Sequence, residues 1–181
     1  DGTEGPTSAA DSDLGMFSLS GECGNDINFD SANEAACGNI GVNATGLGAI
    51  LAPGITYSGT IDLGTCGGNF ANAAEVWIDF DGDGVYEPSE SIAITSGTVP
   101  VSATYSFTVP STVVLGTTVG LRVVQQESGT NPLNPCGTFT WGSIDDFTVT
   151  FEDPANLQGC AAGCTDVCFA EFDPNANSDD G

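Results

Sequence analysis

Residues 76–90 read Val-Trp-Ile-Asp-Phe-Asp-Gly-Asp-Gly-Val-Tyr-Glu-Pro-Ser-Glu, and this stretch decides the fold class. Its first five residues combine β-branched and aromatic side chains, which is typical of a strand, and a glycine-rich segment ends the run. Pro88 interrupts any helix that would follow the acidic segment. The stretch therefore predicts a strand that leads into an acidic turn, and not two helices around a loop.

Short apolar runs of the same kind recur along the chain between clusters of Gly, Pro, Asn and Ser. No segment of ten or more residues has the apolar spacing of three and four that an amphipathic helix requires. The runs lie at residues 17–20, 57–63, 76–80, 91–95, 103–109, 118–125 and 147–151. Regularly spaced short strands predict an all-β fold, an antiparallel β-sandwich of the jelly-roll or immunoglobulin-like type.

Composition divides the 181-residue chain into three parts. Residues 1–12 have no apolar period and are expected to form a flexible arm or linker. Residues 13–152 contain the strand pattern. Residues 153–181 contain three Cys within nine positions and are expected to form a small Cys-rich acidic module, which is too short for a core without disulfides or metal.

The chain carries 25 acidic residues against a single cation, Arg122, and contains no Lys or His, so its formal net charge is −24. This charge excludes nucleic acids and anionic membrane surfaces as partners, and the apolar runs are too short for membrane insertion. Without His and Lys, an enzyme would have to work with carboxylates alone. We therefore expect a protein that is not an enzyme and that has metal cations as counter-ligands.

Residues 79–90 fit the twelve-residue calcium loop, with its first three carboxylates at every second position, a glycine for the sharp turn and a closing glutamate. In such a loop the carboxylates converge on one hard cation, Val85 offers its carbonyl oxygen and Glu90 closes the shell with both oxygens. The predicted ligands are Asp79, Asp81, Asp83, Val85, Glu87 and Glu90. Calcium is therefore the predicted cofactor, and an exposed acidic turn without an ion is the alternative.

The acidic tail offers a second and weaker set of oxygen ligands at alternate positions. Its members are Asp166, Asp173, Asn175, Asn177, Asp179 and Asp180. No single ligand template fixes their order, so a solvated linker held by disulfides is an equal alternative.

Seven cysteines are too many for a reducing compartment unless they bind metal, and their spacings do not form two CxxC pairs. They are Cys23, Cys37, Cys66, Cys136, Cys160, Cys164 and Cys168. We expect disulfides, with Cys23–Cys37 and Cys66–Cys136 as the favoured pairs, although the connectivity stays open. The odd number leaves one thiol for another molecule or for a partner beyond residue 181. Asn43 begins an Asn-Ala-Thr glycosylation sequon, and together these features predict a secreted, extracellular or cell-surface protein.

Arg122 is the only cation, and we expect it to neutralise a partly buried carboxylate, Asp145 or Asp146, and not to bind a ligand. Adjacent strand residues face opposite sides, so these two acids cannot flank one glycosidic bond as a hydrolase requires. Trp77, in an apolar strand, is expected in the core. Trp141 is a better candidate for an exposed ring that stacks on sugars.

Two stretches resemble the GEVED domain family. Residues 76–84 resemble its Trp-Ile-Asp-Phe-Asn-Gln-Asp-Gly run, with Asp81 and Gly82 in place of Asn and Gln. Residues 142–146, Gly-Ser-Ile-Asp-Asp, stand where the family has Gly-Glu-Val-Glu-Asp. The resemblance covers roughly residues 13–152. It implies an extracellular β-sandwich module of bacterial surface or secreted proteins, without established catalysis.

The tail resembles a short repeat of secreted bacterial surface proteins. Residues 163–166, Gly-Cys-Thr-Asp, and residues 172–176, Phe-Asp-Pro-Asn-Ala, resemble its two halves. Residues 179–181, Asp-Asp-Gly, stop just before the Ser-Cys that would close the repeat and make the cysteine count even.

These observations favour a non-catalytic extracellular structural or adhesive module, a calcium-stabilised building block of a surface adhesin or extracellular filament. Its expected partners are neighbouring copies of itself, flanking domains of a longer chain, and glycans. An arm would add a strand to the sheet edge of the next unit. The alternative is a glycan- or protein-binding module of a larger secreted enzyme, which predicts a monomer with a ligand site near Trp141.

Overall fold

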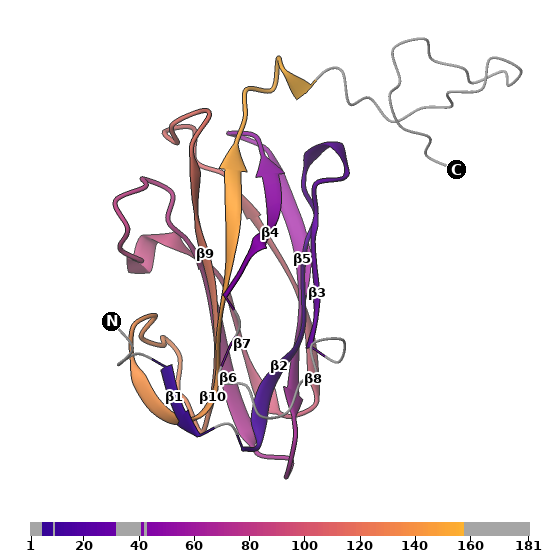
Figure 1. The fold of residues 1–181 in the computed structure, drawn as a ribbon, viewed down its shortest axis with the longest axis vertical. Coiled ribbons are helices and arrows are strands. Elements are labelled where there is room, and N and C mark those ends of the chain that lie inside the picture. Colours follow the sequence, from indigo (N-terminus) through magenta and orange to yellow (C-terminus); the bar gives the residue numbers. More distant parts are fainter. Residues whose placement is uncertain (1–4, 9, 32–40, 42, 158–181) are drawn as a thin grey trace, which may run out of the picture.

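The structure, a computed structural model, describes residues 5–8, 10–31, 41 and 43–157. Ten strands of this part of the chain form two packed sheets, which confirms the predicted all-β sandwich (Figure 1). The strands are β1 (Gly5–Ser8), β2 (Ser12–Leu19), β3 (Ile27–Asp30), β4 (Asn43–Leu51), β5 (Thr56–Thr65), β6 (Ala71–Ile78), β7 (Ser91–Thr98), β8 (Val101–Thr108), β9 (Thr118–Glu127) and β10 (Thr138–Phe151). The described residues also include the 3-10 turns η1 (Glu22–Gly24) and η3 (Pro88–Glu90). Among these residues, no helix has the length and apolar character needed to cross a membrane.

The larger sheet has the order β1-β10-β9-β6-β7, and β4 also pairs with β10. β10 is 14 residues long, and two strands share its outer edge. β1 runs parallel to residues 138–141 of β10, and β4 runs parallel to residues 146–151 (Figure 1). The β10–β9, β9–β6 and β6–β7 ladders are antiparallel. This sheet carries both sequence motifs.

The smaller sheet has the order β3-β2-β5-β8, with antiparallel pairing throughout. Its strands alternate along most of their length, so apolar side chains face the larger sheet and most Ser and Thr side chains of β5 and β8 face solvent. Phe17 of β2 stacks on Phe147 of β10 with ring centroids 5.2 Å apart, and Phe29 of β3 meets the same ring edge-on at 5.4 Å. These rings form the centre of the core between the sheets.

β6 is buried on both of its faces along nearly its whole length. Residues 72–78 are all buried, because side chains on one face enter the core and those on the other lie beneath the loops 79–90 and 128–137. Two-sided burial explains why this strand reads as a nearly continuous apolar run and not as an alternating one.

Every apolar run noted in the sequence lies mainly within a strand, whereas β1, β3 and β4 have no such run. The expected flexible arm, residues 1–12, is wrong for residues 5–8, which form β1, and β2 already begins at Ser12. β1 is stabilised by its ladder with β10, more than 130 residues away in sequence, and a Gly-Pro-Thr-Ser segment carries no local sign of that pairing. The expected tail module falls mostly outside the described residues, which end at residue 157.

Candidate metal site in the β6–β7 loop

The acidic loop joins β6 to β7 and begins at the residue that follows β6. Its five carboxylates gather in two groups, within each of which the candidate ligand oxygens lie within 4.8 Å of one another. One group consists of Asp79, Asp81 and Asp83, and the other of Asp81, Glu87 and Glu90. Because Asp81 belongs to both groups, the loop brings all the predicted carboxylate ligands into one continuous set.

Backbone amides fold the loop around Asp79, which is nearly fully buried. Its Oδ1 accepts hydrogen bonds from the N–H groups of Gly82 at 2.8 Å and Asp83 at 3.2 Å, and its Oδ2 accepts one from Gly84 at 3.0 Å. Gly82 and Gly84 have φ angles of 74° and 85°, which a glycine adopts without strain. The spacing of acids and glycines thus defines a tight turn as well as a ligand set.

The last two acids of the loop hold each other in place. Glu87 and Glu90 form a capping box at η3, in which each side chain accepts a hydrogen bond from the backbone N–H of the other residue. The Oε1 of Glu90 also accepts the N–H of Phe80 at 2.6 Å. Burial raises the pKa of Glu90 to about 7, and the hydrogen bonds from backbone N–H groups oppose this rise only in part. A bound cation would favour the ionised form.

The geometry fits a hard cation with oxygen ligands in a loop that is not an EF-hand. A strand enters the loop and a 3-10 turn leaves it, which is consistent with the interruption expected at Pro88. Val85, the predicted carbonyl ligand, has an exposed side chain and donates its N–H to Asp83 Oδ1 at 2.8 Å. Carboxylates in this number suit calcium. The weaker set in the tail, from Asp166 to Asp180, lies outside the described residues.

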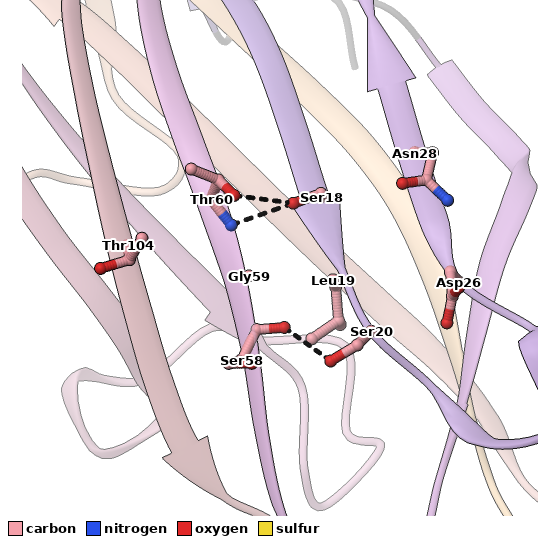
Figure 2. A pocket seen from close by; sticks show the side chains of 9 residues that line it. All are labelled: Ser18, Leu19, Ser20, Asp26, Asn28, Ser58, Gly59, Thr60 and Thr104. Carbon is pink, nitrogen blue, oxygen red and sulfur yellow. Dashed lines mark hydrogen bonds between the residues drawn. The ribbon is translucent and has the colours of Figure 1, made fainter.

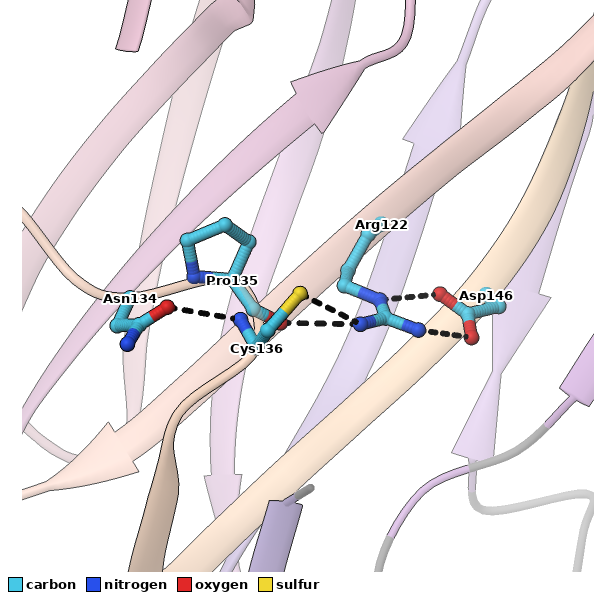
Figure 3. Close-up of polar contacts among 5 residues, drawn as sticks. All are labelled: Arg122, Asn134, Pro135, Cys136 and Asp146. Carbon is cyan, nitrogen blue, oxygen red and sulfur yellow. Dashed lines mark hydrogen bonds and ion pairs between the residues drawn. The ribbon is translucent and has the colours of Figure 1, made fainter. Parts of the chain in front are cut away.

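Arg122 lies beside this loop, over the ring of Tyr86. Figure 3 shows its contacts with Asp146 of β10 and with Pro135 and Cys136 of the β9–β10 loop. Its Nε and Nη2 donate to the two carboxylate oxygens of Asp146 at 2.7 and 2.8 Å. Its Nη1 donates to the carbonyl oxygen of Pro135 at 3.0 Å, and its guanidinium carbon lies 5.4 Å from the ring centroid of Tyr86 in the acidic loop. Of the two carboxylates predicted as partners, Asp146 is the one with which Arg122 forms an ion pair.

The five-residue stretch that begins at Gly142 places its side chains on alternate faces of β10. Gly142 has a φ of 139°, and a Cβ at this position would collide with the carbonyl oxygen of Gln125. Ser143 and Asp145 face inward and are buried, and the Ser143 hydroxyl donates to Asp145 Oδ2 at 2.8 Å. Asp146 faces outward toward Arg122. The two adjacent acids therefore serve different sides of the sheet and do not form a catalytic pair.

Comparison with protein families agrees with the resemblance of the acidic loop and the Gly142 stretch to one family. Residues 73–150 match the GEVED domain. No curated protein matches the chain. The GEVED match extends from β6 to the penultimate residue of β10, so it includes the acidic loop, Arg122 and the Gly142 stretch. It is narrower than the resemblance over residues 13–152, and it does not include the tail repeat.

Glu75 is a buried polar residue of the GEVED region that the sequence analysis did not single out. It is 2% exposed and accepts hydrogen bonds from the Ser91 hydroxyl at 2.6 Å and from the N–H of Leu133 at 2.7 Å. With the buried Trp77 and with Tyr86 it lines a cleft of about 240 Å³ on the outer face of the sheet. The sequence does contain a sign of this site, a carboxylate within an apolar strand run. Such a carboxylate requires hydrogen-bond partners when the strand is buried.

Asp13 is a second titratable group that the sequence analysis missed, at the start of β2 where this strand passes close to β10. Burial raises its pKa from 3.8 to about 6, and the nearby polar groups of Leu14 and Ser143 oppose this rise only in part. The Ser143 hydroxyl oxygen also accepts the N–H of Leu14 at 3.2 Å. No pattern near residue 13 in the sequence indicates this contact with β10.

The predicted Cys66–Cys136 disulfide is wrong, because Cys136 has a free and exposed thiol. Cys66 follows β5 of the smaller sheet, whereas Cys136 lies next to Arg122 on the outer face of the larger sheet, with its Sγ 3.9 Å from Nη1. Cys23 and Cys66 each take part in a disulfide. The other cysteines, Cys37, Cys160, Cys164 and Cys168, lie outside the described residues, so the Cys23–Cys37 pair stays a prediction.

A shallow polar groove of about 390 Å³ lies on the outer face of the smaller sheet (Figure 2). Ser18 donates to the Thr60 hydroxyl at 3.1 Å, and the Ser20 hydroxyl donates to the carbonyl oxygen of Ser58. Among the described residues that line the groove, Asp26 is the one that carries a charge. Hydroxyl and amide groups of this kind suit a neutral ligand.

Two further predicted surface residues are exposed on the larger sheet. Trp141 of β10 is 40% exposed, as expected for a ring outside the core. Asn43, the predicted glycosylation site, is the exposed first residue of β4. Both side chains are accessible to a glycan, as a ligand in the first case and as a covalent attachment in the second.

Proposed function

We propose that this chain is a non-catalytic, calcium-stabilised module of an extracellular structure, a building block of a surface adhesin or filament. The observation that carries the proposal is the gathering of five carboxylates of the β6–β7 loop in two groups that share Asp81. A divalent cation bound there would cross-link the two ends of the loop and offset the repulsion among its charges. The same loop contacts Arg122 through Tyr86, so the ion would stabilise the outer face of the GEVED region.

The absence of catalysis is proposed from the residue types and their placement. The chain has no His or Lys, and its adjacent acids Asp145 and Asp146 face opposite sides of β10. A carboxylate-only hydrolase needs two acids across one cleft. Glu75, in the cleft of the larger sheet, is already engaged by Ser91 and Leu133.

Export of the protein from the cell is proposed from its disulfide-bonded cysteines, its net charge and the availability of calcium. Cys23 and Cys66 each take part in a disulfide, and disulfides persist in oxidising compartments. A net charge of −24 keeps a chain soluble, and calcium is abundant outside cells at the concentrations that weak acidic sites require. These features support a cell-surface or secreted location.

Thermal melting with calcium and with a chelator tests the ion. Calcium should raise the melting temperature of the native chain, and the Asp81→Ala/Asp83→Ala double variant should lose this rise. The Asp26→Ala/Asp153→Ala variant removes the same charge outside the loop and should keep the rise, which separates specific binding from general screening. An equal calcium response in both double variants would contradict the assignment of a calcium site to this loop.

Electron microscopy of the chain with calcium and after chelation tests the building-block role. Ordered filaments or arrays that loosen on chelation are the expected result, and compact single particles under both conditions contradict it.

A glycan- or protein-binding module of a larger secreted enzyme is the second candidate, and the exposed Trp141 favours it. An exposed aromatic ring is the usual platform for sugar stacking. This candidate predicts a monomer whose Trp fluorescence changes saturably with soluble neutral polysaccharides, and Trp141→Ala should abolish that change. No response to any polysaccharide in a panel of dextran, mannan and xylan contradicts the glycan form of this candidate.

A further inference from the structure

β8 forms one edge of the smaller sheet, and among the described residues no strand pairs with its outer side. All of its residues pair with β5 in an unbroken antiparallel register. The N–H of Val109, directly after β8, donates to the carbonyl oxygen of Ile55 at 3.0 Å. Because the direction of backbone groups alternates along a strand, the N–H groups of Thr104 and Ser106 point away from β5. Such groups are a template for another strand.

The β8 edge lacks the devices by which proteins usually block strand addition. Its sequence, Val-Ser-Ala-Thr-Tyr-Ser-Phe-Thr, contains no charge and no Pro, and its register has no bulge. In this acidic chain every interior strand, β2, β5, β6, β9 and β10, carries at least one charged residue. Of the edge strands, β3 carries Asp30, whereas β1, β4, β7 and β8 carry no charge. Except at β3, charged residues thus lie on the interior strands and not at the sheet edges, which is the reverse of the usual protection.

The core is also incompletely covered at β8. It is the one strand of the described chain without a buried residue. Its inward side chains Val101, Tyr105 and Phe107 are only partly buried where they pack against the core. On the neighbouring strand β5, the inward residues Ile61 and Leu63 are each 1% exposed. A further strand beside β8 would cover this margin of the core.

The edge of β7 on the same side of the sandwich is less open. The carbonyl oxygen of Thr95 in β7 accepts a hydrogen bond from Asn131 Nδ2 at 2.9 Å, so the β9–β10 loop already contacts this strand. No side-chain hydrogen bond to the backbone of β8 is present among the described residues. β8 is therefore the better candidate for pairing between molecules.

We propose that β8 pairs with β8 of a second copy of this chain, antiparallel about a two-fold axis, which joins two four-stranded sheets into one. A second copy fits because two β8 edges meet without burying a charge, and outward residues such as Thr104 and Ser106 can form the Ser and Thr pairs that stabilise neighbouring strands. The role of this β8–β8 contact in assembly rests on the proposed building-block function.

The overall charge makes the pairing dependent on ionic strength. Two copies with a net charge of −24 each repel at long range, and salt screens this repulsion beyond about 10 Å at 0.1 M. Strand pairing itself acts at a separation of about 4.8 Å. Association should therefore tighten as sodium chloride is raised, in contrast to an interface held by opposite charges.

Sedimentation velocity of the full chain over a range of concentrations, at low and high sodium chloride, tests the proposal. Thr104 lies near the middle of β8, so Thr104→Asp places like charges close to the two-fold axis and should raise the dimer Kd at least about tenfold. Thr104→Pro removes an outward N–H while the β5 ladder stays intact, and should abolish the dimer. Thr118→Asp adds the same charge at an exposed threonine of the interior strand β9 and should leave the Kd unchanged. Melting curves establish that each variant is folded.

The outcomes separate this inference from the proposed function. If Thr104→Asp and Thr118→Asp weaken the dimer equally, β8 pairing is wrong. Self-assembly through another surface would then remain consistent with the result. A native chain that stays monomeric at both salt concentrations overturns β8 pairing as well. In that case filaments in the electron micrographs would still support the building-block role, whereas their absence would count against both.

Discussion

Arg122→Met is expected to lower the free energy of unfolding by about 2–4 kcal/mol. The Arg122 side chain is 16% exposed and that of its partner Asp146 is 28% exposed. Breaking a buried ion pair from one side costs about 3–5 kcal/mol, and the partial exposure of this pair screens some of that loss. Most of the effect comes from Asp146, which would keep its charge without a partner. The hydrogen bond to Pro135 and the contact with the Tyr86 ring add smaller losses.

Urea denaturation and thermal melting measure this loss, which corresponds to a fall in Tm of about 5–10 °C for a domain of this size. Met preserves the apolar stem of the arginine, so the substitution removes charge and hydrogen bonds with little change in packing. Asp146→Asn supplies the other corner of a double-mutant cycle, with an expected coupling energy of about 1–3 kcal/mol. Arg122→Lys should be intermediate, because it keeps the charge and loses the two-pronged contact. Unchanged stability of Arg122→Met, or two substitutions whose effects simply add, would refute the reasoning.

Two further predictions concern Asp13 and Cys136. Because burial raises the pKa of Asp13 from 3.8 to about 6, the folded chain binds this proton more tightly than the unfolded chain, and stability falls as pH rises from about 4 to about 6. Asp13→Asn should remove about 1 kcal/mol of this fall, as urea midpoints between those pH values would measure; parallel curves for the two proteins contradict the assignment. Cys136→Ser should change the Tm by no more than about 1 °C, since the thiol is free, and a thiol reagent should modify Cys136 in the native chain. A fall of several degrees in the variant would indicate a disulfide.

The sequence by itself determined the fold class and the composition of the acidic loop. Alternation of apolar and polar side chains is a local property with a period of two, so strands such as β5 and β9 are visible without knowledge of their partners. The loop at residues 79–90 is equally local, because its acids and glycines are close neighbours in the chain and fold around Asp79 through short-range hydrogen bonds. The opposite orientation of Asp145 and Asp146 also follows from strand geometry alone.

Only the tertiary structure decided which segments meet. β1 has no apolar pattern and becomes a strand because β10 offers it a free edge. The choice of Asp146 as the partner of Arg122, the free thiol of Cys136 and the burial of Glu75 beneath the β9–β10 loop all depend on contacts across the sheet or between distant loops. The unprotected edge of β8 likewise becomes visible only when the strand order is known. The physical reason is the same in each case: backbone hydrogen bonds and ion pairs between distant residues depend on relative position in space, and local sequence periodicity carries no information about that position.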